Sequence, residues 1–291
     1  MILAAGLGTR LRPLTDELPK PLVPVGDRPS VAHVAAELAA AGITEVVLNT
    51  HHLAEAFTAE VLASLPVDLR VVHEPEILGT GGGVANAAPL LGEGLVVVWN
   101  GDILARVDLR AMIEAHHADR AELTLAIAPR ERGLGTVGVD ARGCVCRLRG
   151  EGFGDEIAGG DFLGVYLLGP TFRARLAAPG CLIGDGAMPW LRAGGRVHAF
   201  AVREPWDDIG SVESYLAANT RWLSRRGLRA FVHPTARVEA GVDVSGSVIG
   251  SGAEVRGHGA LRDVVVWPGA RAEAPLEGAV VTPRVIVASR G

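Results

Sequence analysis

The sequence predicts an α/β fold with a mostly parallel sheet, helices on both of its faces, and a short left-handed β-helix behind it. Up to about residue 228, short apolar, β-branched runs alternate with amphipathic, alanine-rich segments, and this alternation is typical of parallel βαβ units. The runs are almost continuously apolar, as at residues 95–99, which indicates a sheet covered on both faces. After Arg229, glycine and small apolar residues dominate, and valines recur at a spacing of six.

The expected elements follow from the period of the apolar residues. Strands are expected where short apolar runs are bounded by glycine, proline or polar residues, at residues 1–5, 45–50, 69–73, 95–99, 123–128 and 197–202. Helices are expected where apolar residues recur every three or four positions, at residues 30–41, 53–64, 83–91, 108–117 and 212–225. A Rossmann-like sheet of this kind binds ligands at the carboxyl ends of its strands. Binding residues are therefore expected in the loops that follow strands.

The last part of the chain has a hexapeptide period, carried by Val232, Val238 and Val244. Such a period is the signature of a β-helix with one short strand per side, and the alternatives are a glycine-rich loop or a small antiparallel sheet. The sequence thus predicts two domains, residues 1–228 and 229–291. Because a stack of two or three coils exposes apolar edges, the second domain is expected to pack either on the first domain or on another subunit, which would give a homo-oligomer. Its deletion is expected to alter assembly more than chemistry.

Composition excludes several classes of protein. The 291 residues include 28 basic and 33 acidic side chains, a net charge of −5, which argues against nucleic-acid binding. No apolar run approaches the ~18 residues of a membrane span, and the N-terminus lacks a secretion signal, so no membrane contact and a cytoplasmic location are expected. The three cysteines fit neither a disulfide framework nor a zinc site. Lys20 is the only lysine, and glutamine is absent.

The chain opens with its densest motif, which reads Gly6-x-Gly-Thr-Arg-x-Arg and is followed by Pro19-Lys20-Pro. A strand that runs into such a loop can direct amides at phosphate oxygens, and glycine lets the backbone come close. A dinucleotide loop fits less well, because the third glycine is missing and Pro13 stands where a helix should start. Arg10, Arg12 and Lys20 suit a triphosphate.

With these motifs the sequence resembles the sugar-1-phosphate nucleotidyltransferases. The resemblance continues in family order through residues 78–83, 100–102, 164–166 and 206–210 and reaches the hexapeptide segment. Within the family it is nearest to the mannose-1-phosphate guanylyltransferase-like and muramate-1-phosphate uridylyltransferase-like branch.

The resemblance implies an enzyme that joins a nucleoside triphosphate to a sugar 1-phosphate and releases pyrophosphate, with GTP and mannose 1-phosphate as the expected pair. One alternative is a UTP-dependent amino-sugar or muramate 1-phosphate uridylyltransferase. Another is a non-catalytic regulatory subunit that binds nucleotide sugars. The presence of Arg10, Lys20, Asp102 and Asp208 favours an enzyme.

The same resemblance assigns roles to these four residues. Arg10 would hold the β- and γ-phosphates, and Lys20 would lie between the α-phosphate and the sugar phosphate. Asp102 and Asp208 would share one Mg²⁺, which takes one or two carboxylates plus phosphate oxygens. Asp207 is adjacent, but the spacing from Trp206 and Gly210 favours Asp208.

The expected nucleotide site comprises Leu3, Ala5, Gly6, Gly8, Thr9, Arg10, Glu76, Gly79, Thr80 and Gly81. The glycine backbone at residues 79–83 would lie against the base, and the alternative is that this stretch is a flexible loop. Glu76 would accept hydrogen bonds from the N–H donors of guanine. The absence of glutamine disfavours the thymidylyl and glucose-1-phosphate uridylyl branches. The expected sugar-phosphate site comprises Lys20, Gly135, Arg149 and Gly164, with Arg149 in place of a lysine that the family often has.

Overall fold

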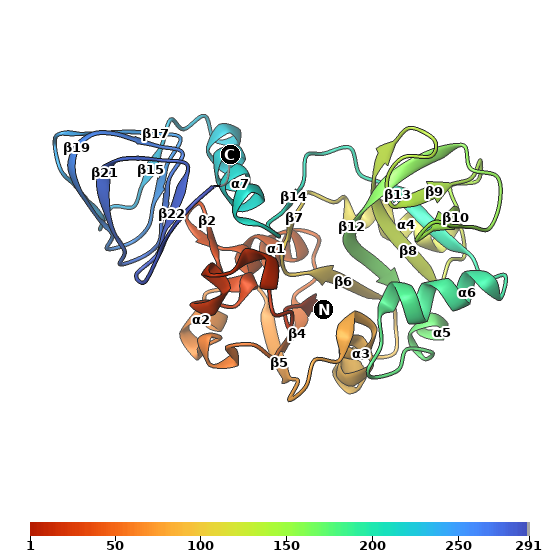
Figure 1. Ribbon diagram of the computed structural model, residues 1–291. Coiled ribbons are helices and arrows are strands. Elements are labelled where there is room, and N and C mark those ends of the chain that lie inside the picture. Colours follow the sequence, from red (N-terminus) through yellow and green to blue (C-terminus); the bar gives the residue numbers. More distant parts are fainter. Residues whose placement is uncertain (290–291) are drawn as a thin grey trace. The chain divides into compact units, whose positions relative to one another are not determined.

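The computed structural model describes residues 1–289, and these residues form two compact units (Figure 1). The first unit consists of Met1–Gly6 and Val34–Trp206. The second consists of Leu7–His33 and the chain from Asp207 onward. None of the helices in this described part is long and apolar enough to cross a bilayer. The division at residue 228 stays a prediction, since Leu7–His33 and Asp207–Leu228 belong to the same unit as the C-terminal segment.

The first unit is built on a mixed sheet. Its parallel part runs in the order β5 (Asp68–His73), β4 (Glu45–Thr50), β1 (Ile2–Leu3) and β6 (Val96–Asn100). Next to β6 lies the long strand β12 (Ala158–Leu168), which is antiparallel to β6, to β8 (Leu123–Arg130) and to β9 (Val137–Val139). The sheet continues through β10 (Val145–Leu148) to β11 (Glu151–Gly152), and β13 (Val197–Ala201) is parallel to β8.

The expected α/β class and the parallel strands are confirmed, and the sheet as a whole is mixed because β12 and its neighbours pair in the antiparallel sense. Residues 135–168, to which the sequence pattern assigns no strand, form β9 to β12. Their period was obscured because β12 begins Ala-Gly-Gly-Asp and carries Gly164 in its middle, and glycine adds no side chain to an alternating pattern.

The expected helices are found with shifted ends. The helix α1 spans Ser30–Ala40, α4 spans Leu109–Ala118 behind the N-cap Asp108, and α7 spans Val212–Arg225 as predicted. The segment 53–64 is divided into a 3₁₀ turn and α2 (Ala59–Ala63), which starts at the N-cap Thr58. The helix α3 (Gly79–Ala87) starts before position 83, and a 3₁₀ turn with a proline follows it. The short helices α5 (Pro170–Arg173) and α6 (Met188–Arg192) were not expected.

The core of the first unit joins the parallel and antiparallel halves of the sheet. Val96 and Val98 of β6 pack in one cluster with Leu123 and Leu125 of β8 and with Tyr166 of β12. Each fully buried aliphatic side chain of this kind contributes roughly 1.5–3 kcal/mol of transfer free energy. The loops that follow β1, β4 and β6 thus start from a rigid sheet.

The C-terminal part of the second unit winds through stacked coils, drawn in blue in Figure 1. One parallel stack contains β15 (Phe231–Val232), β18 (Val248–Ile249), β20 (Val265–Val266) and β22 (Ala279–Val281). A second contains β16 (Arg237–Val238) and β17 (Val242–Ser245) against β19 (Glu254–Arg262), and β19 against β21 (Arg271–Glu277). The valines at positions 232, 238 and 244 thus fall on β15, β16 and β17. The antiparallel strand β23 (Ile286–Ala288) covers the free edge of β22, so that edge is not available to another chain.

Candidate active site

The loop after β1 is shaped by Gly8. Its φ of +60° lies in the left-handed region, and a Cβ there would come within 2.7 Å of Thr15 Cγ2 and 3.3 Å of Lys20 Cβ. Its carbonyl accepts from Leu11 N at 2.9 Å and from Thr15 Oγ1 at 2.9 Å. Within residues 1–289 the N–H groups of positions 6–10 donate no hydrogen bond to another residue. The loop therefore offers a run of uncommitted amides, the arrangement that suits an anion.

Two basic side chains of the second unit converge on Asp208. Lys20 Nζ lies 3.5 Å from Asp208 Oδ1, and Arg10 Nη2 lies 3.9 Å from Asp208 Oδ2. The side chain of Lys20 is 10% exposed, that of Asp208 is 38% exposed and that of Arg10 is 74% exposed. Gly210 makes room for this cluster, since a Cβ there would lie 3.0 Å from both Arg10 Nη2 and Asp208 Oδ1. Three of the four expected catalytic residues thus meet at one place.

The two adjacent aspartates have separate surroundings. Asp207 is 1% exposed and forms ion pairs with Arg221 and Arg225 of α7, at 3.4 Å to Arg225 Nη2. Asp208 instead lies beside Lys20 and Arg10. Alternation along the short extended segment that contains both residues places their side chains on opposite sides. Asp207 is thus a structural anchor, and Asp208 is the carboxylate that a substrate or cation can meet.

The surroundings of Asp208 fit a hard cation. Its Oδ1 atom is buried and accepts no hydrogen bond within residues 1–289, although Lys20 Nζ is near. In the same part of the chain no group of three or more His, Cys, Asp or Glu side chains could hold a metal by itself. Mg²⁺ commonly uses one or two protein carboxylates and completes its shell with water and phosphate oxygens, so a single unsatisfied carboxylate oxygen is compatible with it.

Asp102 lies in the first unit, directly after β6, and Gly101 N donates to Leu3 O at 2.9 Å. The loop end is thereby tied to β1. Asn100 occupies the space above Gly164, whose φ is +73° and whose Cβ would lie 2.6 Å from Asn100 Nδ2. Burial, with the charges of Cys181 and Asp102, raises the pKa of the Tyr166 hydroxyl well above its usual range. That hydroxyl therefore stays neutral.

The glycine motif at residues 79–83 begins α3 and is not a flexible loop. The N–H groups of Gly81 and Gly82 both donate to Gly180 O at 2.9 Å, and a Cβ on Gly79 would lie 2.6 Å from the same oxygen. Thr80 Oγ1 accepts from Leu182 N at 2.9 Å. These glycines allow α3 to lie against the backbone of residues 180–182. Because the amides of Gly81 and Gly82 are already bonded, they are not free to bind a base.

A buried pair that the sequence analysis missed supports this motif. Asn49 Nδ2 donates to Glu74 Oε1 at 2.7 Å, Leu78 N donates to Glu74 Oε2 at 3.1 Å, and Asn49 Oδ1 accepts from Ala4 N at 2.8 Å. Glu74 is fully buried, whereas Glu76 is exposed. Asn49 and Glu74 thus connect the end of β1 to the start of α3. Both residues stand at the carboxyl ends of predicted strands, and this position could have identified them from the sequence.

Replacing Glu74 by alanine is expected to lower the free energy of unfolding by about 2 kcal/mol, because the buried Asn49 amide and the half-buried Leu78 N–H lose their acceptor. The Glu76→Ala variant is the matched control, since its exposed carboxylate has no such role. It is expected to keep wild-type stability in urea denaturation. Equal losses in the two variants would contradict this account of Glu74.

The residues expected for the sugar phosphate lie on the antiparallel half of the first unit, except Lys20. Gly135 has a φ of +77° and forms a bridge with Gly160, where a Cβ would clash with the Gly160 carbonyl. Arg149 Nη2 donates to Cys181 Sγ at 3.3 Å, and its guanidinium lies near Gly184. The side chain of Arg149 is exposed, so its part in phosphate binding stays a prediction.

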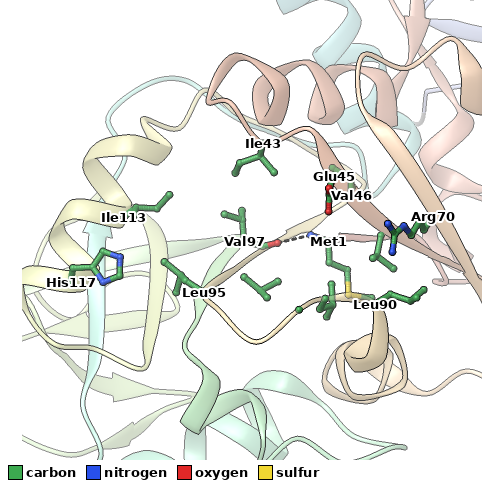
Figure 2. A pocket seen from close by; sticks show the side chains of 14 residues that line it. Met1, Ile43, Glu45, Val46, Arg70, Leu90, Leu95, Val97, Ile113 and His117 are labelled. Atoms are coloured by element: carbon green, nitrogen blue, oxygen red, sulfur yellow. Dashed lines mark hydrogen bonds between the residues drawn. The ribbon is translucent and has the colours of Figure 1, made fainter.

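One cavity of the first unit, of about 430 Å³, lies away from these loops. Figure 2 shows Met1 and Val97 in the middle of the view, joined by a dashed line, with Arg70 and His117 at opposite ends. Met1 N donates to Val97 O at 2.6 Å, and burial lowers the pKa of this amino group to about 5. The lining includes the amino ends of β1, β4 and β6, and ligands of parallel sheets bind at the carboxyl ends. The cavity is therefore not the candidate site.

Comparison with known proteins gives concordant matches. Residues 1–149 match the model of the nucleotidyl transferase family. The chain is 31% identical to a mannose-1-phosphate guanylyltransferase of Mycobacterium tuberculosis, over 94% of this chain and 81% of that protein. It is 35% identical to an N-acetylmuramate alpha-1-phosphate uridylyltransferase of Caulobacter vibrioides, over 76% of this chain and 95% of that protein. HddC from Yersinia pseudotuberculosis, crystallised with GMP-PN, is similar in structure with a TM-score of 0.64 and 25% identity, over 76% of this chain and 97% of HddC.

Proposed function

Because the chain belongs to the nucleotidyl transferase family, we propose that it transfers GMP from GTP to mannose 1-phosphate and releases pyrophosphate. The observation that carries the proposal is the cluster of Arg10, Lys20 and Asp208 beside the uncommitted amides of the Gly8 loop. Two cations and a row of N–H groups suit a polyphosphate. The guanylyltransferase relative supports GTP and mannose 1-phosphate as the substrates.

The reaction needs no covalent enzyme intermediate. An oxygen of the sugar phosphate attacks the α-phosphorus in line, the bond from that phosphorus to the bridging oxygen breaks, and pyrophosphate leaves with the electron pair. Arg10 and the loop amides hold the β- and γ-phosphates. Lys20 neutralises the α-phosphate and the sugar phosphate, two anions that must approach each other. Catalysis is thus positioning and charge neutralisation.

In this proposal Asp102 and Asp208 would hold a divalent cation, Mg²⁺. When bound, the cation neutralises charge that develops on the phosphoryl oxygens. The orphaned Oδ1 atom of Asp208 supports its part in this site. The nucleotide is further held by Leu3, Ala5, Gly6, Thr9, Glu76, Gly79 and Thr80. The sugar phosphate is held by Lys20, Arg149, Gly135 and Gly164.

The base preference is tested with four triphosphates against mannose-, glucose- and N-acetylamino-sugar 1-phosphates, scored by pyrophosphate release. We expect the highest kcat/KM for GTP, a lower value for UTP and a poor one for dTTP, because the chain has no glutamine to read a pyrimidine. A higher kcat/KM for UTP with a muramate or amino-sugar 1-phosphate would establish the alternative, which the uridylyltransferase relative favours. Binding without pyrophosphate release from any pair would indicate a regulatory subunit.

The C-terminal coils are further proposed to be a left-handed β-helix. The hexapeptide spacing and the parallel stacking of β15, β18, β20 and β22 support this assignment. Homo-oligomerisation through residues 229–291 also stays a proposal, and β23 leaves only the other edges of the coils available for it.

A further inference from the structure

A buried hydrogen-bond chain joins the C-terminal coils to the segment that carries Lys20. Trp267, in the coils, donates from Nε1 to the hydroxyl oxygen of Tyr215 on α7 at 3.0 Å, and that hydroxyl donates to the carbonyl of Pro24. Both aromatic side chains are buried. Because each tyrosine hydroxyl has one proton, the acceptance from Trp267 leaves that proton for Pro24. Both hydrogen bonds therefore donate in the same sense, from the Trp267 indole to the Tyr215 hydroxyl and from that hydroxyl to the Pro24 carbonyl.

Lys20 lies at the start of the segment that ends at this carbonyl. Residues Lys20–Leu22 form a 3₁₀ turn, and Val23 N donates to Lys20 O at 3.2 Å. Ser30 closes the other side, with its Oγ donating to Pro21 O at 2.9 Å. With the turn fixed at both ends, a displacement of Pro24 is transmitted to the backbone of Lys20.

The helix α7 contacts both the segment that carries Lys20 and the residue next to Asp208. Tyr215, in its first part, is bonded to the Lys20 segment, and Arg221 and Arg225 are paired with Asp207, the neighbour of Asp208. Asn219, between them, accepts from Gly26 N at 2.8 Å. Tyr215 and Asn219 thus hold the Lys20 segment from the buried face of α7, and Arg221 and Arg225 contact Asp207 from its exposed side.

We propose that Trp267 and Tyr215 are positioning residues, which fix the distance between Lys20 and Asp208 through the carbonyl of Pro24. The inference rests on the role of Lys20 in the proposed function. It makes the C-terminal coils part of the catalytic machinery, although no residue of the coils is assigned to substrate. Contrary to the expectation from sequence, removal of residues 229–291 then lowers turnover as well as altering assembly.

The first test is spectroscopic and independent of activity. Since Lys20 is the only lysine, ¹³C,¹⁵N-lysine labelling of the full chain gives one set of lysine side-chain NMR signals. We expect the ε-carbon and ζ-nitrogen signals to shift in Trp267→Phe and in Tyr215→Phe. The matched control is Trp190→Phe, which also removes one indole hydrogen bond, from Nε1 to Arg196 O at 3.0 Å in the first unit. Unchanged Lys20 signals in both test variants, or an equal shift in the control, would overturn the proposal.

The second test is kinetic and uses the substrate pair that is most active in the panel. We expect Tyr215→Phe to lower kcat about fivefold with KM for the triphosphate within twofold, and Trp190→Phe to leave kcat unchanged at a temperature well below its Tm. In a Lys20→Arg background, Tyr215→Phe should add little, because both changes act through one side chain. Full additivity would contradict the positioning role. If no pair is active, the proposed function fails, and the NMR result still decides the positioning role.

Discussion

Replacing Asp208 by asparagine is expected to lower kcat by roughly a thousandfold, about 4 kcal/mol of barrier, with the fold intact. The carboxylate is the common partner of Lys20 and Arg10, and its Oδ1 atom is unsatisfied. An amide of the same shape removes the negative charge that would hold a cation and leaves one ligand fewer where Mg²⁺ has few protein ligands. Steady-state pyrophosphate release, with circular dichroism to check folding, measures the effect.

The adjacent Asp207→Asn variant is the matched control. Asp207 is buried and paired with Arg221 and Arg225, so its neutralisation should lower the free energy of unfolding by about 2 kcal/mol, less than for a fully buried pair because both arginines are partly exposed. Its kcat in the folded protein should stay near that of the wild type. If Asp207→Asn is folded and inactive while Asp208→Asn keeps its turnover, the assignment of the two aspartates is reversed.

The alternating part of the fold could be predicted because each of its elements is determined locally. The strand at residues 45–50 has three consecutive apolar residues at 46–48, bounded by polar ones, and α7 starts at Ser211 through a capping box with Ser214. Both elements have the bounds that the sequence predicts. The strand β12 could not be found in this way, because glycines interrupt its pattern and its three antiparallel partners lie far away in sequence.

In the candidate site, too, residues close in sequence could be predicted, whereas residues whose partners are distant in sequence could not. Gly8 and Lys20 stand in two motifs only twelve residues apart, so their association could be expected from sequence, and in the structure a Cβ on Gly8 would lie 3.3 Å from Lys20 Cβ. Asn49 and Glu74 escaped notice because each is an ordinary polar residue whose importance comes from a partner on the neighbouring strand. The relation of Trp267 to Tyr215 spans even more of the sequence and is visible only once the coils and α7 are folded.

Lys20→Arg is the variant that separates charge from shape. The lysine side chain is 10% exposed, and a Cβ on Gly8 would lie only 3.3 Å from Lys20 Cβ, so the space around it is limited. An ammonium group is compact and can lie between two phosphates, whereas a planar guanidinium grips one phosphate with two parallel hydrogen bonds and keeps the other at a distance. In a chain that uses arginine at every other basic position, a retained lysine indicates that the smaller group is required.

We therefore expect Lys20→Arg to lower kcat at least about tenfold, roughly 1.4 kcal/mol of barrier, with a smaller effect on KM for the triphosphate. The opposite exchange at an exposed position, Arg229→Lys, is the control: Arg229 pairs with Asp243 at 2.7 Å on the surface of the coils, and its exchange should leave kcat unchanged. A near-wild-type kcat for Lys20→Arg would mean that only the positive charge matters at this position. Lys20 could then not be assigned to the space between the two phosphates, because a longer and planar side chain in that space would lower turnover.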